Sequence, residues 1–400
     1  MEENLSILLK LAILLGASKL MGFLSQKIGL PTVIGKIAVG IILGPAVLGL
    51  IGPNATINVF ALIGVIILMF ISGLETEIDK IKKFGLSSFL IATSGMLFPI
   101  LLSWGVCKLF GLPQDESIFV GIVLSATSVS ITAQTLMELK KMHTDEAATI
   151  MNAAVIDDIM GLVAISIFLG TKGIGDLKFT TTITRLVIFS ASTTAFGYIF
   201  VNFAPKLFNR VKNNDLIMSL IMAFSLLFGW ASEFYAGLAS ITGAYIAGVL
   251  VNKSGIKEKI EKNLKVVGYS IFIPIFFANI GMSFTVRNLN PILIISLLFV
   301  AIASKLLGYM LPAKACGFDW KRSTVIGIGM ISRGEVALIT ATIGATFKII
   351  SPEIYASLVI VAVVTTLITP LLLRFIYSSI GLQQKSKTGK NQHAQQINET

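Results

Sequence analysis

Runs of about 20 predominantly apolar residues recur along almost the whole chain, and each is long enough to cross a bilayer as a helix. Hydrophobic residues make up 54% of the sequence and charged residues 13%, whereas about a quarter of a soluble domain is charged. The sequence therefore predicts an all-α polytopic membrane protein. We count thirteen segments, at 5–26, 31–50, 57–74, 86–111, 117–138, 145–170, 182–208, 216–231, 234–251, 264–284, 291–312, 322–347 and 353–380.

The loops between these segments differ in positive charge. Twenty Lys and Arg residues lie after the odd-numbered segments or in the C-terminal tail, and five lie in the other loops. Because cytoplasmic loops carry the excess of Lys and Arg, this predicts an external N-terminus and a cytoplasmic C-terminus in the inner (plasma) membrane. The net charge of +11 then needs no nucleic acid to explain it. The polar stretch 382–400 is predicted to be a disordered cytoplasmic tail.

A weak internal repeat links two segments rich in small residues. Residues 121–136 read GIVLSATSVSITAQTL, and residues 327–343 read GIGMISRGEVALITATI. Each lies in the fourth helix of a five-helix block, and the blocks are seven helices apart, so their orientations are opposite. Two inverted five-helix repeats are the plan of many secondary transporters. Segments so crowded with Ser, Thr and Gly are predicted to be broken helices that cross near the midplane, where exposed carbonyls and helix ends suit a cation.

Two adjacent acids, Asp157 and Asp158, interrupt the apolar run AAVIDDIMGLV at 153–163. An ionised carboxylate at membrane depth costs at least about 2.5 kcal/mol, so both must be paired, protonated or hydrated. Neighbouring residues of a helix point about 100° apart, which allows the two acids to have different partners. The pair therefore favours ion or proton handling, and a buried pair that only fixes packing is the alternative.

Other polar residues lie within apolar segments and are candidates for the same site. Lys305 is the natural counter-charge for an aspartate, either as a static bridge or as one that breaks during transport. Thr127 and Ser128 could offer oxygens to a small hard cation or bond back to their own helix. An architectural role is favoured for Arg333 and Glu335, and ion coordination by Glu335 is the alternative.

Cysteine and histidine are too sparse to indicate metal or disulfide chemistry. The two cysteines, Cys107 and Cys316, lie in or beside apolar segments, and His143 is the only histidine outside the polar tail. We expect no cofactor, and we expect a transporter rather than an enzyme.

Together, the Asp-Asp run, the LSATSVSITAQTL segment before it, Lys305 and the ISRGEVAL segment resemble the monovalent cation:proton antiporter-2 family. The resemblance covers the chain to about 380 and is closest to stand-alone bacterial sodium/proton antiporters. It implies a homodimer that works by elevator-like alternating access. The implied layout is a transmembrane antiporter domain at 1–381, with core helices at about 86–170 and 291–380, dimer-domain helices at about 5–74 and 216–284, and a linker helix at 182–208.

Carried over by position, the resemblance assigns Asp158 as the main sodium ligand and proton carrier, with Asp157 paired to Lys305. It places Thr127 and Ser128 at the break of the first crossing helix, and Arg333 and Glu335 in the second broken helix. An aspartate at 157, where some relatives have asparagine, resembles the electrogenic subgroup.

The predicted function is exchange of sodium, or lithium, for protons across the membrane. A potassium/proton antiporter of the same family and a sodium-coupled symporter for an organic solute are the alternatives. A channel or receptor-like component is a further class, and the sequence contains no filter-like repeat that would favour it.

Overall fold

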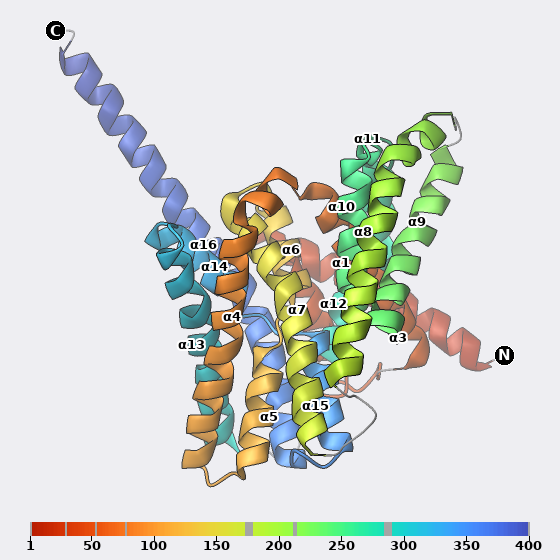
Figure 1. Cartoon of the computed structure of the whole chain (residues 1–400), viewed down its shortest axis with the longest axis vertical. Helices are drawn as coiled ribbons and strands as arrows, with labels where there is room; N and C mark the ends of the chain where they lie inside the picture. The colour runs from red at the N-terminus through yellow and green to blue at the C-terminus, as the bar shows by residue number, and fades with distance from the viewer. Residues whose placement is uncertain are drawn as a thin grey trace.

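The computed structural model describes residues 2–28, 30–52, 54–76, 78–172, 179–210, 214–283 and 290–398. Within these ranges the chain is all helical (Figure 1). The elements are α1 (Glu2–Lys27), α2 (Thr32–Leu43), α3 (Ala55–Glu75), α4 (Ile78–Leu109), α5 (Gln114–Ser125), α6 (Val129–Glu138), α7 (Asp145–Thr171), α8 (Phe179–Arg210), α9 (Asn214–Ala231), η1 (Ser232–Ala236), α10 (Ser240–Lys253), α11 (Lys257–Val267), η2 (Gly268–Phe272), α12 (Ile273–Met282), α13 (Pro291–Ala315), α14 (Trp320–Gly329), α15 (Glu335–Thr346) and α16 (Pro352–Asn398).

Each segment predicted to cross the membrane falls on one helix or on helices in series. Within the described ranges, ten spans are long and apolar enough to cross a bilayer. The segments at 31–50, 234–251 and 322–347 correspond to the shorter helices α2 and α10 and to the interrupted pair α14 and α15. The all-helical membrane fold is confirmed, and the count of thirteen crossings stays a prediction.

The C-terminal helix α16 continues through Asn398 (Figure 1). The disordered cytoplasmic tail at 382–400 stays a prediction.

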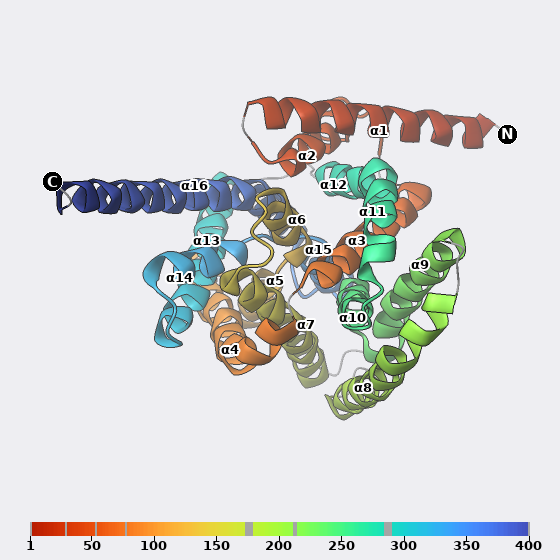
Figure 2. The same ribbon diagram turned by 90° about the horizontal axis from the view of Figure 1, so that it is seen from above.

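The helices form two groups, seen from above in Figure 2. In the first group, α4 packs against α5, α7 and α13, and α13 packs against α14 and α16. In the second, α3 packs against α10 and α12, and α2 packs against α1 and α12. Helix α8 contacts α7 of the first group and α10 and η1 of the second. We call these the α4–α7/α13–α16 group and the α1–α3/α9–α12 group below.

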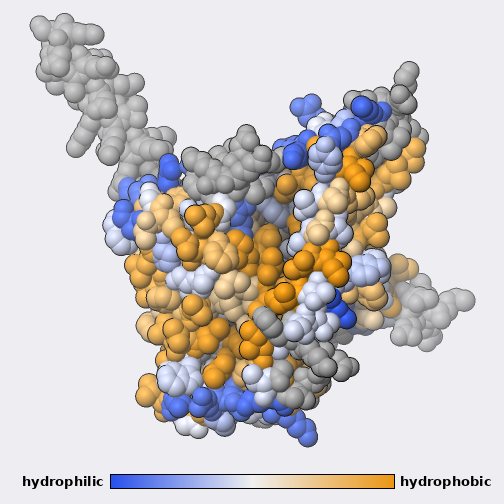
Figure 3. All heavy atoms as spheres, viewed as in Figure 1, coloured by the Kyte–Doolittle hydropathy of each residue, from blue (hydrophilic) through white to orange (hydrophobic). Residues whose placement is uncertain are grey.

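The outer surface is apolar around its middle. Figure 3 shows hydrophobic side chains over the flanks of the molecule and hydrophilic ones gathered at its two ends. An exposed apolar surface of this extent is typical of contact with lipid. The exposed side chains include Leu101, Phe203, Ile292, Phe299 and Phe375.

Candidate functional site

Two interrupted helical runs meet at their breaks, as the sequence predicts. The first run leaves the helix at 126–128, between α5 and α6, and the second at 330–334, between α14 and α15. The backbone N–H of Ser128 donates to the carbonyl of Ser332 at 2.8 Å, and the Ser332 hydroxyl donates to the carbonyl of Ser128 at 2.7 Å. Backbone groups that a break would leave unsatisfied in a membrane therefore bond to each other.

Glycine makes the close approach of the two breaks possible. A Cβ atom added at Gly334 would lie 2.5 Å from Ser128 Oγ and 2.8 Å from Ser128 Cβ, closer than real Cβ contacts. On the other side of the crossing, the Thr132 hydroxyl donates to the carbonyl of Gly329 at 2.5 Å. Small residues are thus required at 128 and 334, because the two irregular segments pack directly against each other there.

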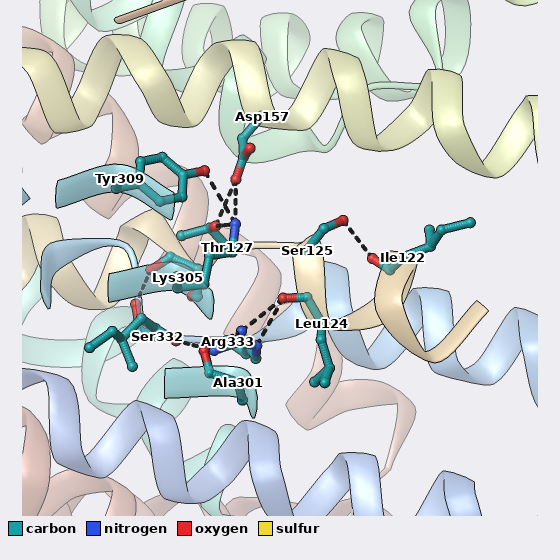
Figure 4. Close-up of polar contacts among 12 residues, drawn as sticks. Ile122, Leu124, Ser125, Thr127, Asp157, Ala301, Lys305, Tyr309, Ser332 and Arg333 are labelled. Carbon is teal, nitrogen blue, oxygen red and sulfur yellow. Dashed lines mark hydrogen bonds and ion pairs between the residues drawn. The ribbon is translucent and has the colours of Figure 1, made fainter. Parts of the chain in front are cut away.

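Arg333 joins the crossing to a third helix (Figure 4). Its guanidinium donates to the carbonyl of Leu124 at 2.8 and 3.2 Å, to that of Ala301 at 2.8 Å and to that of Ile331 at 2.5 Å. The side chain is 1% exposed. Leu124 lies in the last turn of α5, where helix carbonyls carry partial negative charge that a cation stabilises. These contacts support the architectural role expected for Arg333.

An ion pair crosses from α7 to α13 beside this junction (Figure 4). The Lys305 ammonium lies 2.9 Å from Asp157 Oδ2. The Thr127 hydroxyl donates to the same oxygen at 2.7 Å and accepts from Lys305 at 2.7 Å. Lys305 also donates to the Tyr309 hydroxyl at 3.2 Å. The structure therefore brings together three of the residues that the sequence singled out, namely Asp157, Lys305 and Thr127.

A second feature of this ion pair is the other carboxylate oxygen of Asp157. Asp157 Oδ1 is buried, and it has no hydrogen-bond partner among the described residues. A buried charged oxygen without a donor is costly, so such an atom is a place where a cation would be stabilised.

Asp158 is half-buried and faces a different helix from its neighbour. This agrees with the angle of about 100° between successive side chains of a helix. It accepts a hydrogen bond from the hydroxyl of Thr242, in the first turn of α10. The two acids thus have separate partners: Asp157 contacts its own group of helices, and Asp158 contacts the other group.

The remaining predicted residues are placed less directly at this site. The Ser128 hydroxyl contacts Ser130 Oγ at 3.1 Å, so its backbone rather than its side chain joins the crossing. Glu335 begins α15, and its side chain lies outside the described residues.

Sequence reasoning missed Tyr309 and Thr242. Tyr309 lies four residues after Lys305, and residues at this spacing are neighbours on a helix, so this contact could have been found. Thr242 is one of many threonines in apolar segments, and nothing local marks it as a partner of Asp158.

Oxygen atoms are the candidate cation ligands of this site. The carboxylate of Asp157 and the hydroxyl of Thr127 lie at the junction beside the irregular backbone at 126–128, and Asp158 follows Asp157 in α7. Hard cations prefer oxygen ligands of this kind. Within the described part of the chain, no three His, Cys, Asp or Glu residues are grouped to hold a metal ion.

Comparison with known proteins gives concordant results. A family model described as "Sodium/hydrogen exchanger, transmembrane" matches residues 12–378. A probable Na(+)/H(+) antiporter, GerT of Bacillus cereus, is 39% identical over 367 residues, which cover 91% of this chain and 98% of that protein. The Na(+)/H(+)-K(+) antiporter GerN of the same organism is 36% identical over 92% of this chain and 96% of that protein. An Na(+)/H(+) antiporter of Enterococcus hirae is 34% identical over 92% of this chain and 98% of that protein.

A solved structure shares the fold. The sodium proton antiporter MjNhaP1 from Methanocaldococcus jannaschii, at pH 8, superposes with a TM-score of 0.72 over 96% of this chain and 99% of that chain, at 17% identity. The family model spans most of the chain, and the first relatives match over nearly their whole length. The chain is therefore a multi-pass membrane protein that belongs to the sodium/hydrogen exchanger family of monovalent cation:proton antiporters.

Proposed function

We propose that this protein exchanges sodium, or lithium, for protons across the plasma membrane. The observation that carries the proposal is the pair of adjacent carboxylates, one of which, Asp157, keeps a buried oxygen without a hydrogen-bond partner among the described residues. We assign Asp158 as the main sodium ligand and proton carrier, with Asp157 and Thr127 as further oxygen donors.

The chemistry is competition between protons and sodium at one site. With protons abundant, Asp158 is neutral and Lys305 remains charged beside Asp157. When sodium binds, Asp158 loses its proton, the Lys305–Asp157 pair loosens, and Lys305 gives up a second proton. Two protons leave for each sodium ion that enters, so one net charge crosses the membrane. Transport is then coupled to voltage at about 2.3 kcal/mol per 100 mV.

Alternating access in this proposal is a movement between the two helix groups. The α4–α7/α13–α16 group acts as the core that carries the ion, the α1–α3/α9–α12 group forms a homodimer, and α8 links them. Bare charge is penalised at membrane depth, so only a neutralised or occupied site crosses at low cost. We propose as well that the two five-helix blocks form inverted repeats. In this proposal the N-terminus is external and the C-terminus is cytoplasmic.

Potassium is the second candidate substrate. The relative GerN, 36% identical, is named an Na(+)/H(+)-K(+) antiporter, so exchange of both ions exists close to this sequence. An all-oxygen site does not by itself distinguish the two ions, because selectivity depends on the number and spacing of the ligands.

The test is proton flux in sealed proteoliposomes. Sodium, lithium and potassium are added in turn to the wild type and to Asp158→Asn, with and without an imposed membrane potential. We expect cation-driven proton movement that follows the voltage and disappears in the variant. Asp115→Asn is the matched control, because this acid is 54% exposed and pairs with Lys172 at the surface. Sodium-driven flux that persists in Asp158→Asn would contradict the assignment.

A further inference from the structure

One hydrogen bond ties the candidate cation ligand to the opposite helix group. The Thr242 hydroxyl donates to Asp158 Oδ2. Asp158 lies on α7, which packs against α4, whereas Thr242 lies on α10, which packs against α3 and α9. Thr242 is 3% exposed and Asp158 is half-buried, so the contact is partly removed from solvent.

The position of this hydroxyl is fixed by a turn within the bundle. The chain leaves η1 through Gly237, whose φ of +70° is a conformation that other residues rarely adopt, and it enters α10 at Ser240. The Ser232 hydroxyl donates to the carbonyl of Ala239 at 3.0 Å and holds the turn together. Thr242 is the third residue of α10, so the Asp158 carboxylate also lies near the positive end of that helix.

Apolar side chains join α7, α8 and the turn before α10. Leu162, one turn beyond Asp158 on α7, packs with Leu186 and Phe189 of α8 and with Leu238 of the turn. Of these, Leu186, Phe189 and Leu238 are at least 93% buried. The turn that precedes Thr242 is therefore held against α7 and α8 by apolar packing.

We propose that Thr242 is a positioning residue of the transport cycle, whose hydroxyl occupies Asp158 while the site is empty and is displaced when the cation binds. The inference rests on the proposed function and adds a residue from the helix group that does not carry the ion. Because Thr242 lies in the first turn of α10, its hydroxyl can reach Asp158 only in a limited range of positions of α7. When the cation displaces the hydroxyl, α7 is no longer bonded to α10 at this point.

Competition gives a prediction with a definite sign. A hydrogen bond to a charged group stabilises the empty ionised site, and sodium must replace that bond. Removing the hydroxyl therefore strengthens sodium binding, whereas removing a true sodium ligand weakens it. At fixed alkaline pH, we expect the KM of Thr242→Val for sodium to be about tenfold lower than that of the wild type. This factor corresponds to the loss of one hydrogen bond to a charged group.

The experiment measures sodium-driven proton flux in proteoliposomes, together with sodium-dependent thermal stabilisation of the purified full chain in detergent. The second readout detects sodium binding without transport. Thr242→Ser, which keeps a hydroxyl, is expected to restore a KM within about twofold of the wild type. Thr369→Val is the matched control, because this buried hydroxyl donates to the carbonyl of Thr365 in its own helix and has no other partner among the described residues. Thr242→Ala supplies the same test if the valine variant does not fold.

The outcomes separate this inference from the function on which it rests. A lower KM in Thr242→Val, with matching stabilisation at lower sodium concentration, supports displacement. A higher KM would show that Thr242 is a cation ligand and would overturn the proposal. A lower kcat with unchanged KM would show that Thr242 acts only through packing, and would also overturn it. A wild type with neither flux nor sodium-dependent stabilisation would overturn the proposed function and the inference together.

Discussion

Lys305 and Asp157 form an ion pair with 2.9 Å between their charged atoms, and their side chains are 0% and 3% exposed. A pair so completely removed from solvent depends on both partners, because either charge alone would be left buried without compensation. The pair also joins α7 to α13, so its state affects the packing of the helices as well as the charge of the site.

Replacing Lys305 by glutamine is expected to destabilise the fold and to remove voltage-dependent exchange. Loss of one partner of a buried pair costs about 3–5 kcal/mol, and the second proton of the cycle loses its carrier. The measurements are thermal unfolding in detergent and flux under an imposed potential. Adding Asp157→Asn to the lysine variant should recover part of the stability, because it removes the uncompensated charge. Full voltage-dependent transport by Lys305→Gln would show that the lysine carries no proton.

An alanine at Gly334 is expected to separate the two breaks and abolish exchange. Its Cβ would lie 2.5 Å from Ser128 Oγ and 2.8 Å from Ser128 Cβ, and because rotation of the serine side chain cannot move its Cβ, one of the two backbones must shift at the crossing. Ser128→Gly in the same chain removes the obstructing atoms and should restore part of the flux. Gly161→Ala is the control, since nothing lies within 4 Å of a Cβ atom at that position in α7. Equal activity of Gly334→Ala and Gly161→Ala would mean that the close approach is not required.

Arg333→Lys should lower stability although it keeps the charge. A single ammonium cannot reach the carbonyls of Leu124, Ala301 and Ile331 together, and each buried acceptor left unpaired costs about 1–3 kcal/mol. The midpoint of thermal unfolding is the readout. The same exchange at Arg322, which is 51% exposed, should leave that midpoint unchanged. An unchanged midpoint in Arg333→Lys would show that the two interrupted helices keep their structure without the guanidinium.

The pH dependence of the KM for sodium reports how many protons compete for the site. Where one proton competes, the KM rises about tenfold for each unit that the pH falls, and where two compete it rises up to about a hundredfold. The two-proton proposal predicts the steeper slope over the range in which both groups titrate, and Lys305→Gln should reduce it to the shallower one. A tenfold slope in the wild type at every pH would contradict two-for-one exchange.

The helices and the central ion pair follow from the periodicity and charge pattern of the sequence. The apolar runs locate the helices because lipid requires long helical spans, and the cost of burying Asp157 and Lys305 separately predicts that they pair. The breaks at 126–128 and 330–334 follow from their Ser, Thr and Gly content.

What could not be predicted depends on tertiary placement. The sequence places Ser128 and Thr127 side by side, yet only the Thr127 hydroxyl reaches Asp157, because the direction of each side chain is set by the geometry of the break. Thr242 meets Asp158 because α10 begins after a π-helical turn, and the sequence analysis gave only two apolar segments, 216–231 and 234–251, in this region.

The mutual bonding of the two breaks also sets an order of events during synthesis. Ser128 and Ser332 are 204 residues apart in the chain. At about 5–20 residues per second, the ribosome needs about 10 to 40 s to reach the second after making the first. Throughout that interval the irregular backbone of the first crossing helix lacks its partner within the membrane. Early helices of the nascent chain must therefore remain open to rearrangement, and any factor that shields unsatisfied backbone at the insertion site acts during this interval.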